Sequence, residues 1–314
     1  MTQRQRRNLL LYPLLLPSLI LVILYLYYPI FNTLYLSLFD IRNFNLDQMI
    51  FLGLKNYQKL VNDPVFWLSF RNTVILLGAT ILIQLPIAFY LADYMVNHLR
   101  KKHSRLEAWL LLALFFPVVL PTPVLAKTWR TIFLGMAGAG YGPFEWVCTK
   151  LGITYLVTQV LGTKTVLLLG EVNTAIWILI AVQTWARIGF NLLIYRSSIL
   201  TITSEIYESA EIDGASAWDK LFRITIPLTR NVINLSIILA VLGVFQLFDM
   251  AWMLTGAATG GGGPLNTTYL LATYMYSRSF INLSTGYGAA IAIMILMISL
   301  FISLVERRIF RVMN

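Results

Sequence analysis

Residues 279–305 have the sequence SFINLSTGYGAAIAIMILMISLFISLV, and this run alone settles the class of fold. It contains no Asp, Glu, Lys or Arg. A helix needs about 20 mostly apolar residues to cross the hydrocarbon core of a bilayer, and this run is longer than that. Since no water in that core can hydrogen-bond an open backbone, such a segment crosses as a helix. The run therefore predicts a transmembrane helix over about 279–305.

Five further segments upstream have the same apolar character. They predict helices over about 9–39, 72–97, 106–126, 173–198 and 231–254. The first is far too long for the apolar part of a signal peptide and lacks a small-residue cleavage pattern, so we expect no cleavage there. Together these segments predict an all-α integral membrane protein of about six transmembrane helices, forming a single domain over 1–314.

The composition agrees with a chain that is largely covered by lipid. Hydrophobic residues make up 58% of the 314 residues and charged residues only 12%, and the mean hydropathy is +0.72. Soluble domains have about 45–50% apolar and about 25% charged residues. On a soluble protein the net charge of +10 would suggest a nucleic-acid partner. In a membrane protein Lys and Arg instead accumulate in cytoplasmic loops, so we expect contact with membrane lipid and no nucleic acid.

The distribution of basic residues predicts how the chain is inserted. Lysine and arginine are densest in the N-terminal segment, in the connection 98–105, in the segment 196–230 and after residue 305. The connections on the opposite side have fewer basic residues for their length. Because cytoplasmic segments of membrane proteins hold the excess of Lys and Arg, we expect both termini in the cytoplasm.

Few residues suited to catalysis or metal binding are present. Cys148 is the only cysteine, which excludes an intrachain disulfide and a cysteine-based metal cluster. His98 and His103 both lie in a basic connection. The sequence contains no Gly-x4-Gly-Lys-Ser/Thr motif for nucleotide binding. We therefore expect no catalytic residue, no metal site and no cofactor in this chain.

The most informative connection is the segment 204–228, with the sequence SEIYESAEIDGASAWDKLFRITIPL. Ser204 can cap a first helix through its side-chain oxygen. The Asp-Gly pair at 213–214 predicts a turn, since glycine adopts positive φ without strain. Residues 215–222 predict a second short helix, and Pro227 is expected to interrupt the chain before the next span. A helix, a turn and a helix on the cytoplasmic side predict a docking element.

This segment resembles the EAA loop of binding-protein-dependent ABC importer permeases. The family pattern is Glu-Ala-Ala, three residues, Gly, nine residues and Ile-x-Leu-Pro. Here Glu208-Ser209-Ala210 is followed at the same spacings by Gly214 and by Ile224-Thr225-Ile226-Pro227. Serine for the first alanine and isoleucine for leucine are conservative departures. The resemblance implies a type I ABC importer permease fold, in which this coupling-helix loop fits into a cleft of an ATPase subunit.

The same resemblance implies which residues dock and what they dock on. The implied docking residues are Glu208, Ala210, Asp213 and Gly214. The implied partners are a second related permease subunit, two ATP-binding subunits that hold ATP and Mg²⁺, and an extracytoplasmic solute-binding protein. The implied location is the bacterial cytoplasmic (inner) membrane, as a multi-pass protein.

Other segments resemble the carbohydrate-importer branch of this family, and within it the maltose and glycerol-phosphate type of first permease subunit. They are Tyr35–Phe39, Phe51–Tyr57, Asn72-Thr73, Gly189-Phe190-Asn191 and the segment 254–264. The large extra outer domain of the enteric maltose subunit has no counterpart here. The resemblance implies import of a sugar or oligosaccharide by alternating access, and it leaves the identity, length and charge of the sugar open.

Polar and aromatic residues within the apolar segments are candidates for the sugar pathway. Arginine at membrane depth is costly and usually functional, so Arg187 is either a donor to the sugar or a structural partner, for example of Asp249. Gln183 lies on the same helical face, and we expect it to make interhelical hydrogen bonds. The resemblance implies a sugar site around Arg187 and in a second stretch at 244–249; helix packing is the alternative role. The candidate pathway residues are Arg187, Phe190, Asn191, Val244, Phe245, Gln246 and Asp249.

A glycine-rich connection, AATGGGG at 257–263, precedes Pro264. A phosphate-binding loop would need a Lys-Ser/Thr pair and a helix directly after it, and neither follows here. By resemblance this outer connection contacts the solute-binding protein, and a flexible surface loop is the plainer alternative. The candidate contact residues are Gly256, Gly262, Gly263 and Pro264.

Two other classes of function are alternatives. A secondary transporter of small polar solutes uses intramembrane acids for ion coupling, and often inverted repeats. Only Asp93 and Asp249 approach membrane depth, and no inverted repeat is evident. A membrane-embedded enzyme needs a convergent catalytic set, and none stands out in the sequence. The sequence therefore favours a non-catalytic permease subunit whose ATP is hydrolysed on a separate chain.

Overall fold

The computed structural model describes residues 15–99, 104–134, 142–163, 167–255 and 261–312. Within them five helices are long and apolar enough to cross a membrane, namely Leu15–Leu36, Pro64–Leu99, Ala175–Ile199, Ala217–Phe245 and Thr285–Arg308. A bent pair of helices brings the number of spans in the described chain to as many as six. The predicted all-α membrane fold of about six spans is therefore confirmed. The predicted start of the first helix, near residue 9, lies outside the described residues.

The chain divides into two compact units, of which the first comprises residues 1–63 and 275–297. Its short strands pair antiparallel, with Phe39 opposite Phe51, and the hydroxyl of Tyr287 donates to the Asp63 carboxylate at 2.5 Å. The elements of this unit are η1 Ile23–Tyr27, α2 Tyr28–Leu36, β1 Phe39–Asp40, η2 Leu46–Gln48, β2 Ile50–Phe51, α3 Lys55–Val61, η8 Ser277–Ile281 and the first part of α17 Thr285–Val312.

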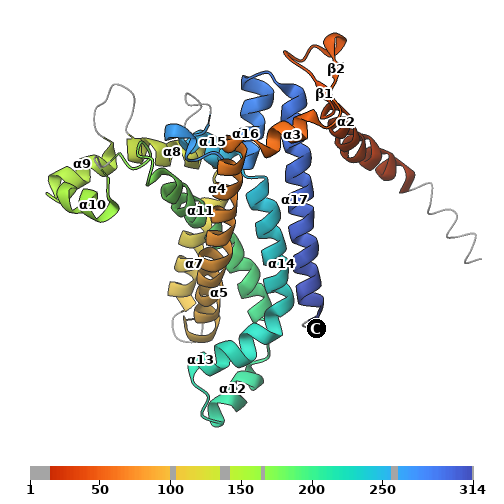
Figure 1. Ribbon diagram of the computed structural model, residues 1–314. Helices are drawn as coiled ribbons and strands as arrows, with labels where there is room; N and C mark the ends of the chain where they lie inside the picture. The colour runs from red at the N-terminus through yellow and green to blue at the C-terminus, as the bar shows by residue number, and fades with distance from the viewer. Residues whose placement is uncertain (1–14, 100–103, 135–141, 164–166, 256–260, 313–314) are drawn as a thin grey trace, which may run out of the picture. The chain divides into compact units, whose positions relative to one another are not determined.

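The second unit comprises residues 64–274 and 298–314 and holds the central helices. Figure 1 shows α4 and α5 in line, α7, α11 and α14 beside them, and α12 and α13 beyond their lower ends. Its elements are α4 Pro64–Ala79, η3 Thr80–Gln84, α5 Leu85–Tyr94, η4 Met95–Leu99, α7 Ser104–Val119, α8 Thr122–Leu134, α9 Pro143–Lys150, α10 Thr154–Leu161, α11 Ala175–Ile199, α12 Ser204–Ile212, α13 Ala217–Lys220, η5 Leu221–Thr225, α14 Ile226–Phe245, α15 Asp249–Thr255, η7 Pro264–Asn266 and most of α16 Leu271–Tyr276.

The core of the second unit lies where α5 packs against α11. Ala88 and Ala92 on α5 are fully buried and lie one turn apart, and Leu192 and Tyr195 of α11 belong to the same buried cluster. Small residues at such contacts let membrane helices approach closely, because van der Waals packing drives their association. This contact fixes α5 and α11 as neighbours over much of their length.

The region predicted as one helix over 106–126 is two helices, α7 and α8, which meet at an angle of 99°. The bend falls where Leu120 precedes Pro121. A proline disfavours the helical conformation of the residue before it and cannot donate a backbone hydrogen bond. The chain restarts directly after the bend, where the Val124 N–H donates to the Pro121 carbonyl at 3.0 Å.

The region predicted as a helix over 231–254 also has different bounds. Helical structure begins at Ala217 and ends at Phe245, and a separate short helix, α15, starts at Asp249. Pro227 does not interrupt the chain, because it occupies the first turn of α14 directly after the π-helical turn η5. Proline is tolerated in the first turn of an α-helix. The segment 204–228, predicted to dock on a partner protein and called the docking segment below, is thus continuous with the span that follows it.

Candidate functional site

A cavity of about 90 Å³ lies between the helix Pro64–Leu99, α11 and α14. It contains four of the predicted pathway residues, Arg187, Phe190, Asn191 and Val244. Its other polar lining residues are Thr80, Gln84 and Gln183. One guanidinium, three amides, one hydroxyl and one aromatic ring therefore converge on a single space. Polar groups at membrane depth normally face protein or a water-filled cavity, and these face a cavity.

The residues of α11 that line the cavity are spaced so that they fall on one face of the helix. Gln183, Arg187 and Asn191 are each four residues apart, so they share one face of the helix. Gly189 lies on the opposite face, where a Cβ atom would collide with the backbone of Leu114 in α7. The close approach of α7 and α11 at this glycine fixes the rotation of α11. The polar face is thereby turned away from α7 and toward the cavity.

Thr80 and Gln84 line the cavity and were not among the predicted pathway residues. They form the first and last positions of the π-helical turn η3, and Gln84 is only 3% exposed. Single π-helical turns within α-helices are frequent at functional sites. The available signal was a glutamine inside the otherwise apolar run ILIQLP at 81–86, since a polar residue at membrane depth is itself a functional hint.

Three predicted pathway residues are not in this cavity. Phe245 is buried at the end of α14, and Gln246 and Asp249 are exposed. The prediction placed Gln246 and Asp249 in one helix over 231–254, but the helix ends at Phe245 and α15 begins at Asp249. Among the described residues Arg187 forms no ion pair, with Asp249 or with another carboxylate.

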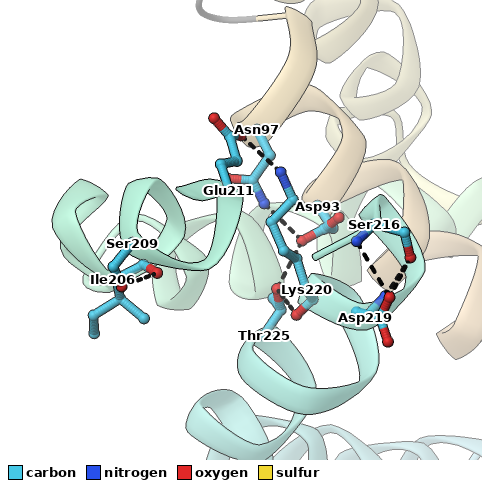
Figure 2. Close-up of polar contacts among 9 residues, drawn as sticks. All are labelled: Asp93, Asn97, Ile206, Ser209, Glu211, Ser216, Asp219, Lys220 and Thr225. Atoms are coloured by element: carbon cyan, nitrogen blue, oxygen red, sulfur yellow. Dashed lines mark hydrogen bonds and ion pairs between the residues drawn. The ribbon is translucent and has the colours of Figure 1, made fainter. Parts of the chain in front are cut away.

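The docking segment has the predicted order of helix, turn and helix. The helix α12 begins after Thr203, whose side chain makes no capping bond, so Ser204 is not its cap. Gly214 has a φ of +78°, as the predicted turn requires. The second helix is the capped one: Ser216 Oγ accepts from the Asp219 N–H at 3.2 Å, and Asp219 accepts from the Ser216 N–H (Figure 2).

An ion pair joins the two short helices of this segment. Lys220 Nζ lies 2.7 Å from the Glu211 carboxylate (Figure 2). The predicted docking residues Glu208, Asp213 and Gly214 are exposed, and Ala210 is half-buried. Ile212 is 87% exposed beside them and was not among the predicted docking residues. The docking segment therefore has exposed carboxylates beside an exposed apolar side chain, a surface that is accessible to a partner protein.

The glycine-rich connection is only partly described, and Gly256 lies outside the described residues. Gly262 and Gly263 are buried, and a Cβ at Gly262 would come within 2.6 Å of the Tyr269 ring. These two glycines are therefore packing positions, and close contact explains why they carry no side chain. Leu265, which follows Pro264, is 81% exposed and is the apolar tip of this connection.

The segment after this tip is held to α4. Asn72 Nδ2 donates to the carbonyls of Thr267 and Tyr269 at 2.9 and 3.0 Å. Thr73 Oγ1 accepts from the Leu271 N–H at 3.1 Å. The Asn72-Thr73 pair thus fixes the chain that carries Leu265. No group of three or more His, Cys, Asp or Glu residues in the described part of the chain is placed to bind a metal ion.

Comparison with known proteins points to one family. Residues 84–313 match the family described as binding-protein-dependent transport system inner membrane component. The probable ABC transporter permease protein YurN of Bacillus subtilis (strain 168) is 32% identical over 302 residues, covering 96% of this chain and 95% of the relative. The lactose transport system permease protein LacF of Rhizobium radiobacter is 30% identical over 291 residues, covering 92% of this chain and 90% of the relative.

The fold is also similar to that of a solved structure. This is a bacterial ABC transporter involved in the import of the acidic polysaccharide alginate. The TM-score is 0.78 at 22% identity, and the match covers 98% of this chain and 96% of the other. The similarity is one of fold, and it confirms the predicted importer-permease architecture.

Proposed function

Because the chain belongs to the family of binding-protein-dependent transport system inner membrane components, we propose that it is the membrane-spanning subunit of an ATP-driven sugar importer. A solute-binding protein delivers the sugar outside, and ATP binding and hydrolysis on two partner subunits drive alternating access. ATP and Mg²⁺ are bound by those subunits. The protein lies in the bacterial cytoplasmic membrane with both termini inside, as the distribution of basic residues predicts.

The observation that most supports this proposal is the projecting docking segment. It combines the family spacing from Glu208 to Pro227 with a rigid fold, exposed carboxylates and an exposed Ile212. It is also continuous with the span Ala217–Phe245, one wall of the cavity. A force applied to the segment by an ATPase subunit therefore acts on a helix that borders the solute pathway.

The chemistry of the cavity supports a sugar as the solute. Amide and guanidinium groups donate hydrogen bonds to hydroxyls, and the amide oxygens accept them. The ring of Phe190, 40% exposed, offers an apolar face for a pyranose. LacF, a relative that is similar over nearly the whole chain, is named for lactose transport. We therefore propose Gln84, Gln183, Arg187, Phe190 and Asn191 as the sugar contacts of this subunit.

The size of the cavity supports a site that is shared between two permeases. Small-molecule sites usually enclose about 300–1,000 Å³, whereas this cavity encloses about 90 Å³. A second, related permease subunit would supply the opposite wall. On the outer side we propose that Pro264 and the exposed Leu265 contact the solute-binding protein, with Gly262 and Gly263 shaping that connection and Gly256 adjoining it.

The proposal is tested by co-purification of the tagged chain from its native membrane. We expect a second permease and an ATPase with the natural chain, and loss of the ATPase from Gly214→Pro, because proline cannot adopt a φ of +78°. The matched control is Gly152→Pro, at a glycine with a φ of +67° and open space around it, in the connection between α9 and α10. Purification of the natural chain without any ATPase would contradict the proposal.

A further inference from the structure

Two polar side chains, Asp93 and Asn97, lie near the end of the helix Pro64–Leu99, beside a cavity that is also lined by His98, Tyr207, Glu211 and Lys220. Asp93 is 7% exposed, and Asn97 lies one turn further on and is half-buried. Asn97 Nδ2 donates to Asp93 Oδ1 at 2.8 Å (Figure 2). A buried carboxylate is costly unless it is hydrogen-bonded, so the partners of Asp93 require an explanation.

The second partner of Asp93 comes from the docking segment. Thr225 Oγ1, fully buried, donates to the same Asp93 oxygen at 3.1 Å (Figure 2). The Tyr207 hydroxyl lies 3.0 Å from Thr225 Oγ1. Thr225 Oγ1 also lies 3.3 Å from the Lys220 carbonyl (Figure 2). Since its one hydroxyl hydrogen is directed to one of these two acceptors, the Asp93 carboxylate or the Lys220 carbonyl, we assign Tyr207 as the donor to Thr225. Burial raises the pKa of the Tyr207 phenol, so this donor keeps its proton well above neutral pH.

The result is a continuous chain of three side chains, from Tyr207 in α12 through Thr225 in η5 to Asp93 in α5. It begins on the docking segment and ends on a transmembrane helix that is far away in sequence. Buried polar side chains cost free energy unless they are hydrogen-bonded, and here each side chain supplies a partner to the next. The chain of side chains therefore joins the docking segment to α5 by specific, directional contacts.

A second contact joins the same two elements. The ring of Trp218, in α13, is stacked with that of Tyr90, in α5, with centroids 6.1 Å apart and planes inclined by 19°. The docking segment is thus attached to α5 at Tyr90 by an exposed aromatic stack and at Asp93 by a buried hydrogen bond from Thr225. If both contacts stay intact, α5 must move together with the docking segment.

The other end of α5 reaches the solute cavity. Gln84, the last residue of η3, lines that cavity, and α5 runs as a regular α-helix from Leu85 to Tyr94. Nine residues separate Gln84 from Asp93, or about 14 Å at 1.5 Å per residue. The π-helical turns η3 and η4 flank this rigid section. Gln84 directly adjoins the start of this section, so a rigid-body movement of α5 at its Asp93 end would also displace Gln84.

We propose that Asp93 is a positioning residue through which the docking segment moves the Gln84 wall of the solute cavity. This inference rests on the proposed function and deepens it. The spans on either side of the docking segment, α11 and α14, are joined to it covalently. Asp93 adds a third span, which the chain connectivity does not attach, and so makes three walls of the cavity move together.

The test measures the accessibility of the cavity to a thiol reagent, so the identity of the sugar is not needed. Cys148, the only cysteine, is replaced by serine, and a reporter cysteine is introduced as Gly243→Cys. Gly243 lines the cavity and has open space where a Cβ would lie. The intact complex with its ATPase subunits is treated with a membrane-impermeant methanethiosulfonate, with and without ATP and vanadate. The labelling rate and the ATPase rate are measured on the same preparation.

We expect the labelling rate to change severalfold with nucleotide in the reporter protein. Asp93→Ala should retain the bound ATPase and its hydrolysis while the nucleotide-dependent change shrinks about two- to thirtyfold, the range found within coupling networks. Asp93→Asn, which keeps an oxygen acceptor, should restore part of the change. The control Glu107→Gln alters another buried carboxylate, which binds Arg196 at 2.6 Å and joins α7 to α11, and should lower yield alone.

Where Asp93→Ala does not assemble, Thr225→Val tests the same bond at nearly unchanged volume. The inference is overturned if the nucleotide-dependent change is the same in the reporter protein, in Asp93→Ala and in Thr225→Val. A reporter complex that binds no ATPase and shows no response to nucleotide overturns the proposed function itself. The two failures are therefore distinguishable.

Discussion

The helix Pro64–Leu99 is fastened near both of its ends, but to different kinds of group. Near its start, Asn72 donates to the backbone carbonyls of Thr267 and Tyr269. Near its end, Asp93 accepts from the hydroxyl of Thr225, a side chain. A backbone carbonyl can move only with its segment, whereas a hydroxyl can rotate and exchange partners. The first fastening is suited to a fixed frame and the second to a contact that changes during transport.

Of the substitutions that test this difference between the two ends of the helix, Asn72→Ala should have the largest effect. One buried and one partly buried carbonyl lose their donor, and each unsatisfied group costs about 1–3 kcal/mol, so we expect the unfolding free energy to fall by about 2–6 kcal/mol. Thermal unfolding of the detergent-solubilised complex measures this. Asn62→Ala is the control, because Asn62 donates to the Gln58 carbonyl at an exposed site. Equal melting temperatures of the two variants would refute the fixed-frame interpretation.

Tyr207→Phe acts on the opposite end and should affect transport more than stability. It leaves buried Thr225 without its donor, and we expect import to fall about tenfold, in line with a cost of 1–3 kcal/mol for an unsatisfied group. Initial rates of ATP-dependent sugar uptake measure this at equal complex yield. The control is Tyr94→Phe on the exposed side of α5. A fall in yield as large as the fall in uptake would make the contact purely structural.

Gln84→Leu probes the cavity between the two fastenings. It keeps the volume of the side chain but removes its hydrogen-bonding groups, and we expect uptake to fall about fivefold, the equivalent of one hydrogen bond of about 1 kcal/mol. The basal ATPase rate should not change. Leu82→Ala, on the same π-helical turn but outside the cavity, is the comparison. Unchanged uptake in Gln84→Leu would remove Gln84 from the pathway.

The smallest effect is expected for Glu211→Gln. Its ion pair with Lys220 is at the surface, with the Glu211 side chain 56% exposed, and exposed pairs contribute about 0–1 kcal/mol. Uptake should stay within about twofold of the natural protein at low and at high salt. A loss equal to that of Tyr207→Phe would show that the ion pair, and not the buried chain, holds the docking segment.

Much of the fold could be predicted because lipid imposes a simple rule on the chain. Each long apolar run, such as 279–305, had to be a helix, and the spacing of Gln183, Arg187 and Asn191 placed them on one face. The family spacing from Glu208 to Gly214 located the docking segment. These features depend on local sequence, and the structure has them close to where the sequence predicted them, although the last spanning helix begins at Thr285 and not at residue 279.

The remaining features depend on contacts between segments that are distant in sequence. The end of α14 at Phe245 removed Gln246 and Asp249 from the helix that lines the cavity, and no proline or glycine directly follows that end. Gly262 is buried because the ring of Tyr269 packs against it. Gln84 and Asp93 acquire their places only when α5 packs against α11 and the docking segment, which no periodicity in a single sequence records.

Reconstitution into proteoliposomes tests whether transport is driven by ATP. The chain is reconstituted with its second permease and ATPase subunits, and uptake of radiolabelled sugars is followed with the solute-binding protein outside and ATP inside. We predict uptake that requires the binding protein and ATP and that is absent when the ATPase subunits are omitted. Uptake by the chain without ATPase subunits, driven by a proton or sodium gradient, would contradict the account.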